Sequence, residues 1–334
     1  MMDDGVARES LPTRRRGRQR RRVVAGAIVA FLIVGAVLTA GLVRTSKAGT
    51  AGALLVASED CPTIDEDSHL PSIAPAPGID WTLCVLPGID LSGADLTGAS
   101  LGGATLTGAT FTGTTLTDAT LTEAILTDAI MTNAKLIRAT MARSTLTKAT
   151  LNGADFGGAD LSFAEMSHAD LTGATLVKAD LHDAVLGYAI LSGTVLTEAD
   201  MSRADLTWAN LTGAFFTNAA LTGAHLADAD MGGGVDLKGA DLTDADLSRV
   251  DMTGGDLTGA HLIRSSLMST ILAAVDATGA DFSDANLTDA DLTSVTLTDA
   301  ILTGVLYSNT ICPNATNSDA VGGSCVGQEV VPAS

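Results

Sequence analysis

Aromatic and charged residues are scarce in this chain of 334 residues. Aromatic residues make up 3% of it and charged residues 17%, below the roughly 25% charged content usual for globular chains. The shortage of aromatics argues against a conventional aromatic-rich core, while a hydrophobic content of 46% excludes a wholly disordered acidic chain. The net charge of −20 disfavours nucleic acid as a partner attracted by charge alone.

Motifs that carry common enzyme chemistry are missing as well. The sequence contains no CxxC motif, no HExxH motif and no glycine loop that leads into a helical pattern. Ser is plentiful, but no arrangement of Ser, His and Asp stands out from the surrounding sequence. We therefore expect a protein that is not an enzyme and has no cofactor, catalytic residue or resident metal.

The first 43 residues combine a basic segment with an uncharged apolar one. Residues 1–22 have a net charge of +5, and residues 23–43 contain no charged residue. About 20 apolar residues span a bilayer as a helix, and Arg clusters stay on the cytoplasmic side. The pattern predicts a single-pass helix in a bacterial cell membrane, with the rest of the chain extracytoplasmic. Seven Arg determine this topology: Arg14, Arg15, Arg16, Arg18, Arg20, Arg21 and Arg22.

Two other interpretations of this segment remain open. A cleaved signal peptide would leave a secreted protein, although such peptides have a shorter apolar region and end in an A-x-A-like site. The Arg run could instead contact nucleic acid. Its position directly before the apolar stretch favours a role in membrane topology.

A period of five residues dominates the sequence from residue 91 onward. Leu, Met or Phe occupies every fifth position from Leu91 to Met231, and the same period runs from Leu237 to Leu302 with one break at Ala277. Successive residues at this spacing would drift around an α-helix and alternate between the faces of a flat strand. The chain keeps them all on one side only by turning a corner every five residues. The sequence therefore predicts a solenoid.

The other positions of each unit agree with this prediction. Ala stands two residues before the Leu in 32 of 43 units, where a small side chain lets the walls approach closely. The outward residue between them is Asp in 17 units, and the two residues after the Leu are commonly turn formers such as Thr-Gly. The insert-like stretch 232–236 shifts the period by one residue, which we interpret as a bulge or corner adjustment.

These units resemble the pentapeptide-repeat family, whose consensus is A-(D/N)-L-x-x. The stretches 94–98 (ADLTG) and 159–163 (ADLSF) match it directly. The resemblance covers residues 86–306 and implies an all-β fold, a right-handed quadrilateral β-helix with four pentapeptides per coil. The 43 units would form about 11 coils, and at the strand spacing the rod would be about 50 Å long.

The segments beside the repeat contain all four Cys. We expect a basic tail at 1–22, a transmembrane helix at 23–43, a linker at 44–57, an N-terminal cap at 58–85 and a C-terminal cap at 307–334. A rod would hold the two caps far apart, whereas a disulfide needs Cα atoms within about 7 Å. We therefore predict the disulfides Cys61–Cys84 and Cys312–Cys325, which an oxidising, exported location permits. Buried free thiols are the alternative.

In a coil of 20 residues, equivalent positions recur every 20 residues. The four His within the repeat (His168, His182, His225 and His261) then occupy four different positions, so no two would stack as ligands. Several Asp would instead form one column, interrupted by Ala220 and His261. We treat this column as a candidate acidic interaction stripe: Asp160, Asp180, Asp200, Asp241 and Asp281. A family-consensus Asp on a solvated face explains it equally, and oxygen ligands for Ca²⁺ or Mg²⁺ are a further interpretation.

Three functions follow as hypotheses. The first is a membrane-anchored extracytoplasmic scaffold that binds an unknown protein or envelope partner. The second comes from the resemblance, since some family members mimic duplex DNA and bind topoisomerases such as gyrase in the cytoplasm. The third is a passive structural spacer. Charge indicates where a partner would bind, because residues 98–152 have a net charge of +1 and residues 153–306 a net charge of −18.

Overall fold

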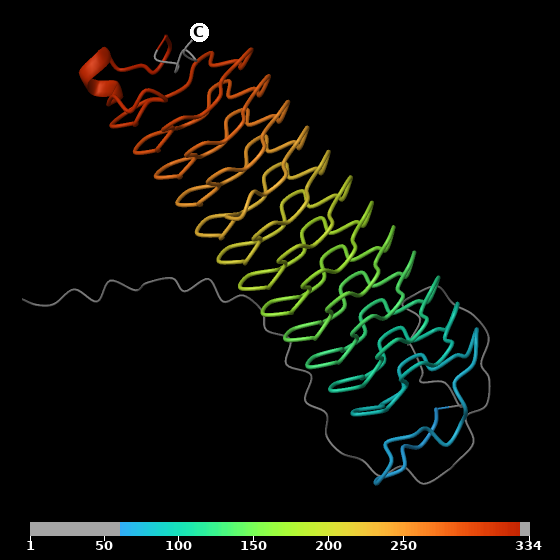
Figure 1. The fold of residues 1–334 in the computed structure, drawn as a ribbon. Helices are drawn as coiled ribbons and strands as arrows, with labels where there is room; N and C mark the ends of the chain where they lie inside the picture. The colour runs from blue at the N-terminus through green and yellow to red at the C-terminus, as the bar shows by residue number, and fades with distance from the viewer. Residues whose placement is uncertain (1–60, 328–334) are drawn as a thin grey trace, which may run out of the picture. The chain divides into compact units, whose positions relative to one another are not determined.

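The computed structural model describes residues 61–327, which wind into a stack of similar coils (Figure 1). We number the positions of each unit from the central Leu, so that a unit reads −2, −1, 0, +1, +2. Parallel bridges join each −1 residue to the −1 residue of the next coil, from Asp80 with Ser100 to Asp291 with Ile311. These partners are 20 residues apart along most of the stack, so four pentapeptides complete one coil.

Backbone hydrogen bonds between coils involve three N–H groups of each unit. The N–H of Leu171, at position 0, donates to the carbonyl of Ile190 at 2.7 Å, and that of Gly173, at +2, donates to Ser192 at 3.0 Å. The N–H of Asp170, at −1, donates at 2.9 Å to the preceding coil. Each coil is thus bonded to both neighbours, which satisfies most of the buried backbone.

A tight turn closes every corner of the coil. The N–H of Ala174 donates to the carbonyl of Leu171 at 2.9 Å, and Gly173 between them has a φ of 64°. Positive φ at the second central residue is the type II β-turn arrangement. Non-glycine residues adopt it too, such as Arg138 with φ 56° and Trp208 with φ 61°. This conformation costs an L-residue about 1–2 kcal/mol, so the ladder and the core must outweigh that cost.

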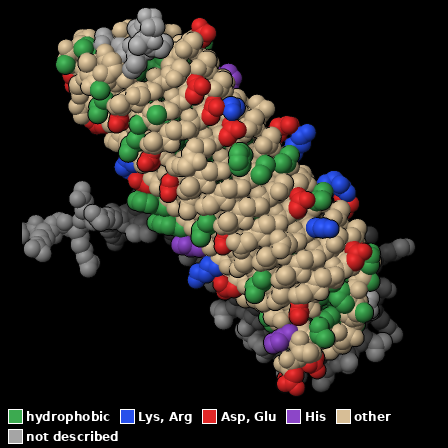
Figure 2. Space-filling model, in the orientation of Figure 1, with side chains coloured by type: hydrophobic (Ala, Val, Ile, Leu, Met, Phe, Trp, Pro, Cys, Tyr) green, Lys and Arg blue, Asp and Glu red, His purple; other side chains and the backbone are tan. Residues whose placement is uncertain are grey.

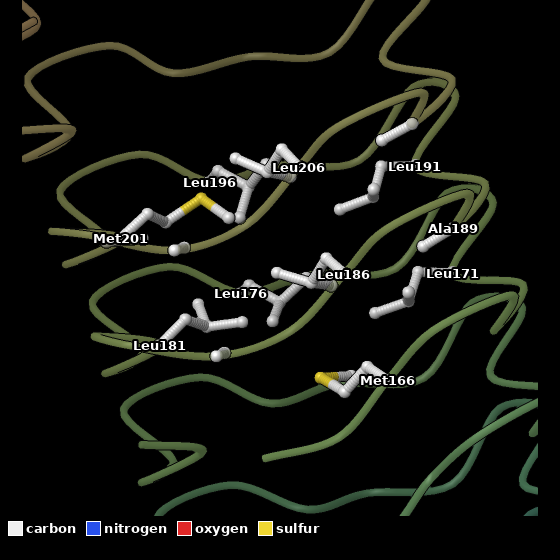
Figure 3. Packing of buried hydrophobic residues seen from close by; sticks show 14 of the residues in the cluster. Met166, Leu171, Leu176, Leu181, Leu186, Ala189, Leu191, Leu196, Met201 and Leu206 are labelled. Carbon is white, nitrogen blue, oxygen red and sulfur yellow. The ribbon is translucent and has the colours of Figure 1, made fainter. Parts of the chain in front are cut away.

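The side chains at positions 0 and −2 form one continuous core. Figure 3 shows Leu176 in line with Leu196 and Leu186 in line with Leu206, each pair one coil apart. Central Leu residues such as these are fully buried, and so is nearly every Ala at −2. Ladders of like side chains thus fill the interior from one coil to the next, and shielding them from water stabilises the stack.

Polar residues that replace Ala at −2 form hydrogen bonds inside the core. The Thr114 hydroxyl donates to the carbonyl of Leu91 at 2.6 Å, and the Thr194 hydroxyl donates to that of Leu171 at 3.1 Å. Thr270 and Thr310 make the same contact with a Leu 23 residues earlier. These buried hydroxyls therefore avoid the cost of an unpaired polar group.

One unit contains six residues rather than five. After Met231, both Gly233 (φ 72°) and Gly234 (φ 77°) adopt positive φ, and the next bridge pairs Phe215 with Asp236, 21 residues apart. Two consecutive residues with positive φ favour glycine, because it has no Cβ. The coil absorbs the extra residue at a corner, and the stacking register continues beyond it.

Short non-repeat segments flank the stack. At the N-terminal side Ile64 pairs antiparallel with Pro71, and a disulfide joins Cys61 to Cys84 with Cα atoms 5.5 Å apart. Trp81 occupies position 0 in the first coil and is fully buried.

The C-terminal side contains the 3-10 helix η1 (Ser318–Val321), drawn in red in Figure 1. The Asn317 side chain caps it by accepting from the Asp319 N–H. A second disulfide joins Cys312 to Cys325 with Cα atoms 5.2 Å apart. Both disulfides predicted from the sequence are confirmed.

The predicted membrane anchor lies outside the described residues. The same is true of the basic tail at 1–22 and the linker at 44–57. Within residues 61–327, no helix has the length and apolar character needed to cross a membrane.

Candidate interaction surface

The five Asp of the candidate stripe lie in one column of −1 positions. Bridges pair Asp160 with Asp180 and Asp180 with Asp200, and the column continues through Ala220 to Asp241. His261 then separates Asp241 from the last member, Asp281. The structure therefore brings these residues together in the register that a count of 20 residues, with one extra residue after Met231, predicts.

Each carboxylate in the column also organises the turn that follows it. Asp160 Oδ1 accepts the backbone N–H of Ser162 at 3.0 Å and its hydroxyl at 2.6 Å. Asp281 makes the same two contacts with Ser283, at 2.9 and 2.6 Å. Because the N–H at +1 makes no bond to a neighbouring coil, Asp at −1 supplies its acceptor. The consensus Asp is thus a structural residue whose Oδ2 still points a charge outward.

One member of the column has a perturbed acidity. Burial raises the pKa of Asp241, but hydrogen bonds from the side chain and backbone of Thr243 and from the Thr222 hydroxyl together lower that pKa below its ordinary value of 3.8. Hydrogen bonds to a carboxylate favour its charged form. Asp241 therefore stays ionised at neutral pH, as an electrostatic role requires.

Charged side chains at +2 pair between neighbouring coils. Arg138 donates from Nε and Nη2 to the two oxygens of Asp118, both at 2.7 Å. The pairs Arg203–Asp183, Arg249–Asp228 and Arg264–Asp244 repeat this bidentate contact. These Arg are about half exposed or more, so each pair contributes little to stability. The pairs neutralise the Asp at +2 but leave the Asp at −1 as the source of negative charge.

Aromatic side chains gather along one corner of the coil stack. At consecutive +2 positions, the rings of His168 and Tyr188 stack with centroids 5.1 Å apart, and those of Tyr188 and Trp208 lie 6.3 Å apart. Tyr188 and Trp208 are 55% and 53% exposed, an unusual state for half of the Tyr and Trp in an aromatic-poor chain. Sequence reasoning missed this ladder, although its signal, a spacing of 20 residues, was present.

A second aromatic group lies at a neighbouring corner. The Arg143 guanidinium lies 5.3 Å from the centroid of the Phe163 ring, and His182 contacts that ring edge-on at 4.9 Å. His182 Nδ1 also lies 2.6 Å from Oδ1 of Asp180 in the acidic column. The predicted column and this aromatic group are therefore in direct contact. Figure 2 shows small groups of hydrophobic and His side chains between charged ones on the face in view.

The described residues offer little for catalysis or metal binding. Across residues 61–327, no group of three or more His, Cys, Asp or Glu is arranged to hold a metal ion. The four repeat His occupy different positions of the unit and different columns, as the count of 20 predicts. The arrangement suits recognition by charge and by aromatic contact.

Comparison with protein families agrees with this geometry. The profile described as "Pentapeptide repeats" matches a series of segments that together run from residue 84 to residue 304. The chain belongs to the pentapeptide-repeat family. Proteins of this family fold as right-handed quadrilateral β-helices, so the predicted fold class is confirmed for the repeat. Pentapeptide-repeat proteins are generally non-enzymatic structural or interaction proteins.

Solved structures similar to this pentapeptide-repeat protein include HetL from the cyanobacterium Nostoc sp. strain PCC 7120, which is involved in regulation of heterocyst differentiation. The two chains are 30% identical, with 72% of this chain and 92% of HetL covered and a TM-score of 0.41. QnrB1, a plasmid-mediated fluoroquinolone resistance protein, is 22% identical over 53% of this chain and 88% of its own, with a TM-score of 0.29.

A third similar structure is a pentapeptide-repeat protein from the thylakoid lumen of Arabidopsis thaliana. It is 35% identical over 34% of this chain and 68% of its own, with a TM-score of 0.22. No protein with a curated description matches the chain.

Proposed function

We propose that this protein is a non-enzymatic scaffold, anchored in the membrane by residues 23–43, whose solenoid of about 11 coils binds a protein or envelope partner outside the cytoplasm. The observation that carries the proposal is the pair of disulfides, Cys61–Cys84 and Cys312–Cys325. Disulfides persist in oxidising compartments and are rare in the cytosol. The basic tail before an uncharged stretch of 21 residues supports the same orientation.

The acidic column offers a binding surface for such a partner. Its carboxylates repeat at the coil spacing of about 4.8 Å, which concentrates negative charge along one face. Carboxylates held this close repel one another, and a basic partner relieves that repulsion. We propose that Asp160, Asp180, Asp200, Asp241 and Asp281 form the acidic interaction stripe.

Protease shaving of intact cells tests the location. An exported solenoid is digested in whole cells, whereas a cytoplasmic one is digested only after lysis. A cytoplasmic protein expressed in the same cells controls for leakage. Alkylation of free thiols before denaturation supports the proposal if all four Cys are protected and opposes it if they react.

Neutral variants of the stripe test the interaction. Asn at −1 keeps the turn, since Asn210 Oδ1 accepts the N–H and hydroxyl of Thr212 at 3.0 and 2.7 Å as Asp does elsewhere. Asp→Asn changes therefore remove charge while the local hydrogen bonds remain. We expect loss of partners that co-purify with the native protein when Asp160, Asp180, Asp200 and Asp241 are changed. The matched control changes four −1 Asp of another face: Asp170, Asp230, Asp251 and Asp291.

The negative charge of residues 153–306 also favours a second candidate, a DNA mimic that binds a topoisomerase such as gyrase. That function requires the solenoid to be cytoplasmic. Inhibition of gyrase supercoiling by the purified protein, together with resistance to shaving, would support it over the scaffold. Retention of every partner in the stripe variant, with the solenoid exported, would instead favour a passive spacer.

A further inference from the structure

The ladder of His168, Tyr188 and Trp208, here called the aromatic corner, is displayed at a place where the fold does not need it. Side chains at +2 point away from the core, and glycine fills this position in many other units. A large ring at +2 also has to adopt positive φ, here 60° for Tyr188 and 61° for Trp208. Three rings at consecutive coils therefore add exposed apolar area and backbone strain without adding to the core.

The rings leave part of their faces uncovered. The planes of Tyr188 and Trp208 are parallel within 5°, yet their centroids are 6.3 Å apart. Because neighbouring coils repeat at about 4.8 Å, the two rings must be displaced sideways, which leaves part of a ring face open. A ring face carries partial negative charge and attracts a cation, most strongly on Trp.

The surface beside the aromatic corner is flat and accessible. The next units along the coils have Gly173 and Gly193 at +2, and the space beside both is open. Ile190, two residues after Tyr188, is 40% exposed on the face between these two corners. An extended segment of another chain can therefore lie across this face without meeting a wall of side chains.

Negative charge surrounds the aromatic corner. Asp205 lies in the same unit as Trp208, Asp170 follows His168 by two residues, and Asp230 lies one coil further on. The turn hydrogen bonds of these three Asp use Oδ1, so Oδ2 is free of them. The protein also contains an example of the contact that such a surface favours, with Arg143 placed over the exposed ring of Phe163.

From the open ring faces, the flat neighbouring face and the flanking carboxylates, we propose that the aromatic corner docks an arginine-bearing segment of a protein partner. Guanidinium groups stack on Tyr188 and Trp208 and pair with the nearby carboxylates. Arg suits this site better than Lys, because its planar group both stacks on a ring and binds a carboxylate through two N–H groups. This inference rests on the scaffold proposed above and names the chemistry of its partner.

The test uses the full-length chain in neutral detergent and a fluorescent peptide of alternating Arg and Gly as probe. In the variant Tyr188→Asn with Trp208→Asn, we expect affinity for the peptide to fall about tenfold. Asn tolerates positive φ, and Asn133 and Asn218 already occupy +2 positions. The control Ser269→Asn, three coils further along the same corner, should leave affinity unchanged.

Further probes separate aromatic contact from charge alone. A Lys–Gly peptide of equal length should bind several-fold more weakly than the Arg–Gly peptide. Equal binding of both peptides with no effect of the double Asn variant would overturn the proposal, and so would absence of binding by the Arg–Gly peptide. Because binding is measured on purified protein, these outcomes do not depend on protease shaving. A failure of the scaffold's location is therefore distinguishable from a failure of the aromatic corner.

Discussion

Asp228 and Arg249 are 21 residues apart and form a bidentate pair, with Arg249 Nε 2.6 Å from Asp228 Oδ1. The equivalent pair Arg264–Asp244 spans 20 residues at nearly the same distance. The extra residue between Asp228 and Arg249 is therefore absorbed at the glycine corner after Met231. Its insertion leaves the register of the neighbouring columns intact.

We expect deletion of Gly234 to leave the solenoid folded and its thermal midpoint unchanged or raised. The deletion restores a five-residue unit, and removal of a flexible glycine contributes up to about 1 kcal/mol. Deletion of Gly193, from an ordinary unit, should lower the midpoint strongly, because every later residue then loses its register with the preceding coil. Equal loss of stability from both deletions, measured by circular dichroism, would show that the sixth residue is required.

Leu186→Asp should destabilise the protein by several kcal/mol, because it places an unpaired charge at a fully buried position. The matched control is Val185→Asp, one residue earlier and 38% exposed at −1, where Asp is common. We expect that control to stay near the native stability. Urea unfolding of the two variants measures the difference, and similar midpoints would contradict the inward placement of Leu186.

The Asp at −1 predict a loss of stability in acid. Hydrogen bonds from Thr82, Ser92 and Thr97 lower the pKa of Asp80, Asp90 and Asp95 below 3.8. A carboxyl whose pKa is lower in the folded state stabilises the fold above its unfolded pKa, and that contribution is lost as pH falls through the folded pKa. Thermal midpoints should therefore be steady above about pH 5 and fall below about pH 4.

Asn at these three positions should reduce the acid sensitivity. An amide oxygen accepts the same turn hydrogen bonds and does not titrate, as Asn286 shows with Thr288 at 3.1 and 2.7 Å. We expect the triple variant Asp80→Asn, Asp90→Asn, Asp95→Asn to lose less stability between pH 7 and pH 3 than the native protein. An identical acid profile would assign the effect to other groups.

Removal of the C-terminal disulfide should loosen one end of the stack. Cys312→Ala with Cys325→Ala opens a link between residues 13 apart, with an expected cost of about 3 kcal/mol. In a solenoid each coil contacts only its neighbours, so hydrogen exchange should rise mainly at residues 292–311. The variant Cys61→Ala with Cys84→Ala should leave exchange there unchanged, and an equal rise in both variants would contradict independent ends.

The repeat could be predicted well because the period alone decides where each residue lies. A period of five places Leu186 inside, and a count of 20 aligns Asp160 with Asp180 and Asp200. No property of the individual side chains beyond size and polarity is needed for this. The register survives the single insertion because the period resumes after it.

Features that depend on backbone geometry were less accessible. The hydrogen bonds from Ser162 to Asp160 follow from the turn and not from the spacing, so the consensus Asp was considered only as surface charge. The pairing of Ile64 with Pro71 lies outside the repeat and has no period to reveal it. Tyr188 and Trp208 were overlooked because the search for stacked functional residues considered His and Asp alone.

The positive φ at +2 separates what this protein can recognise from how it folds. The backbone there has the same conformation whether the residue is Gly173, Arg138 or Trp208. Mutation at these corners can therefore exchange one surface chemistry for another while each core ladder stays unchanged. Such a protein can acquire new partners by drift at its corners, and it can lengthen by duplication in steps of one coil.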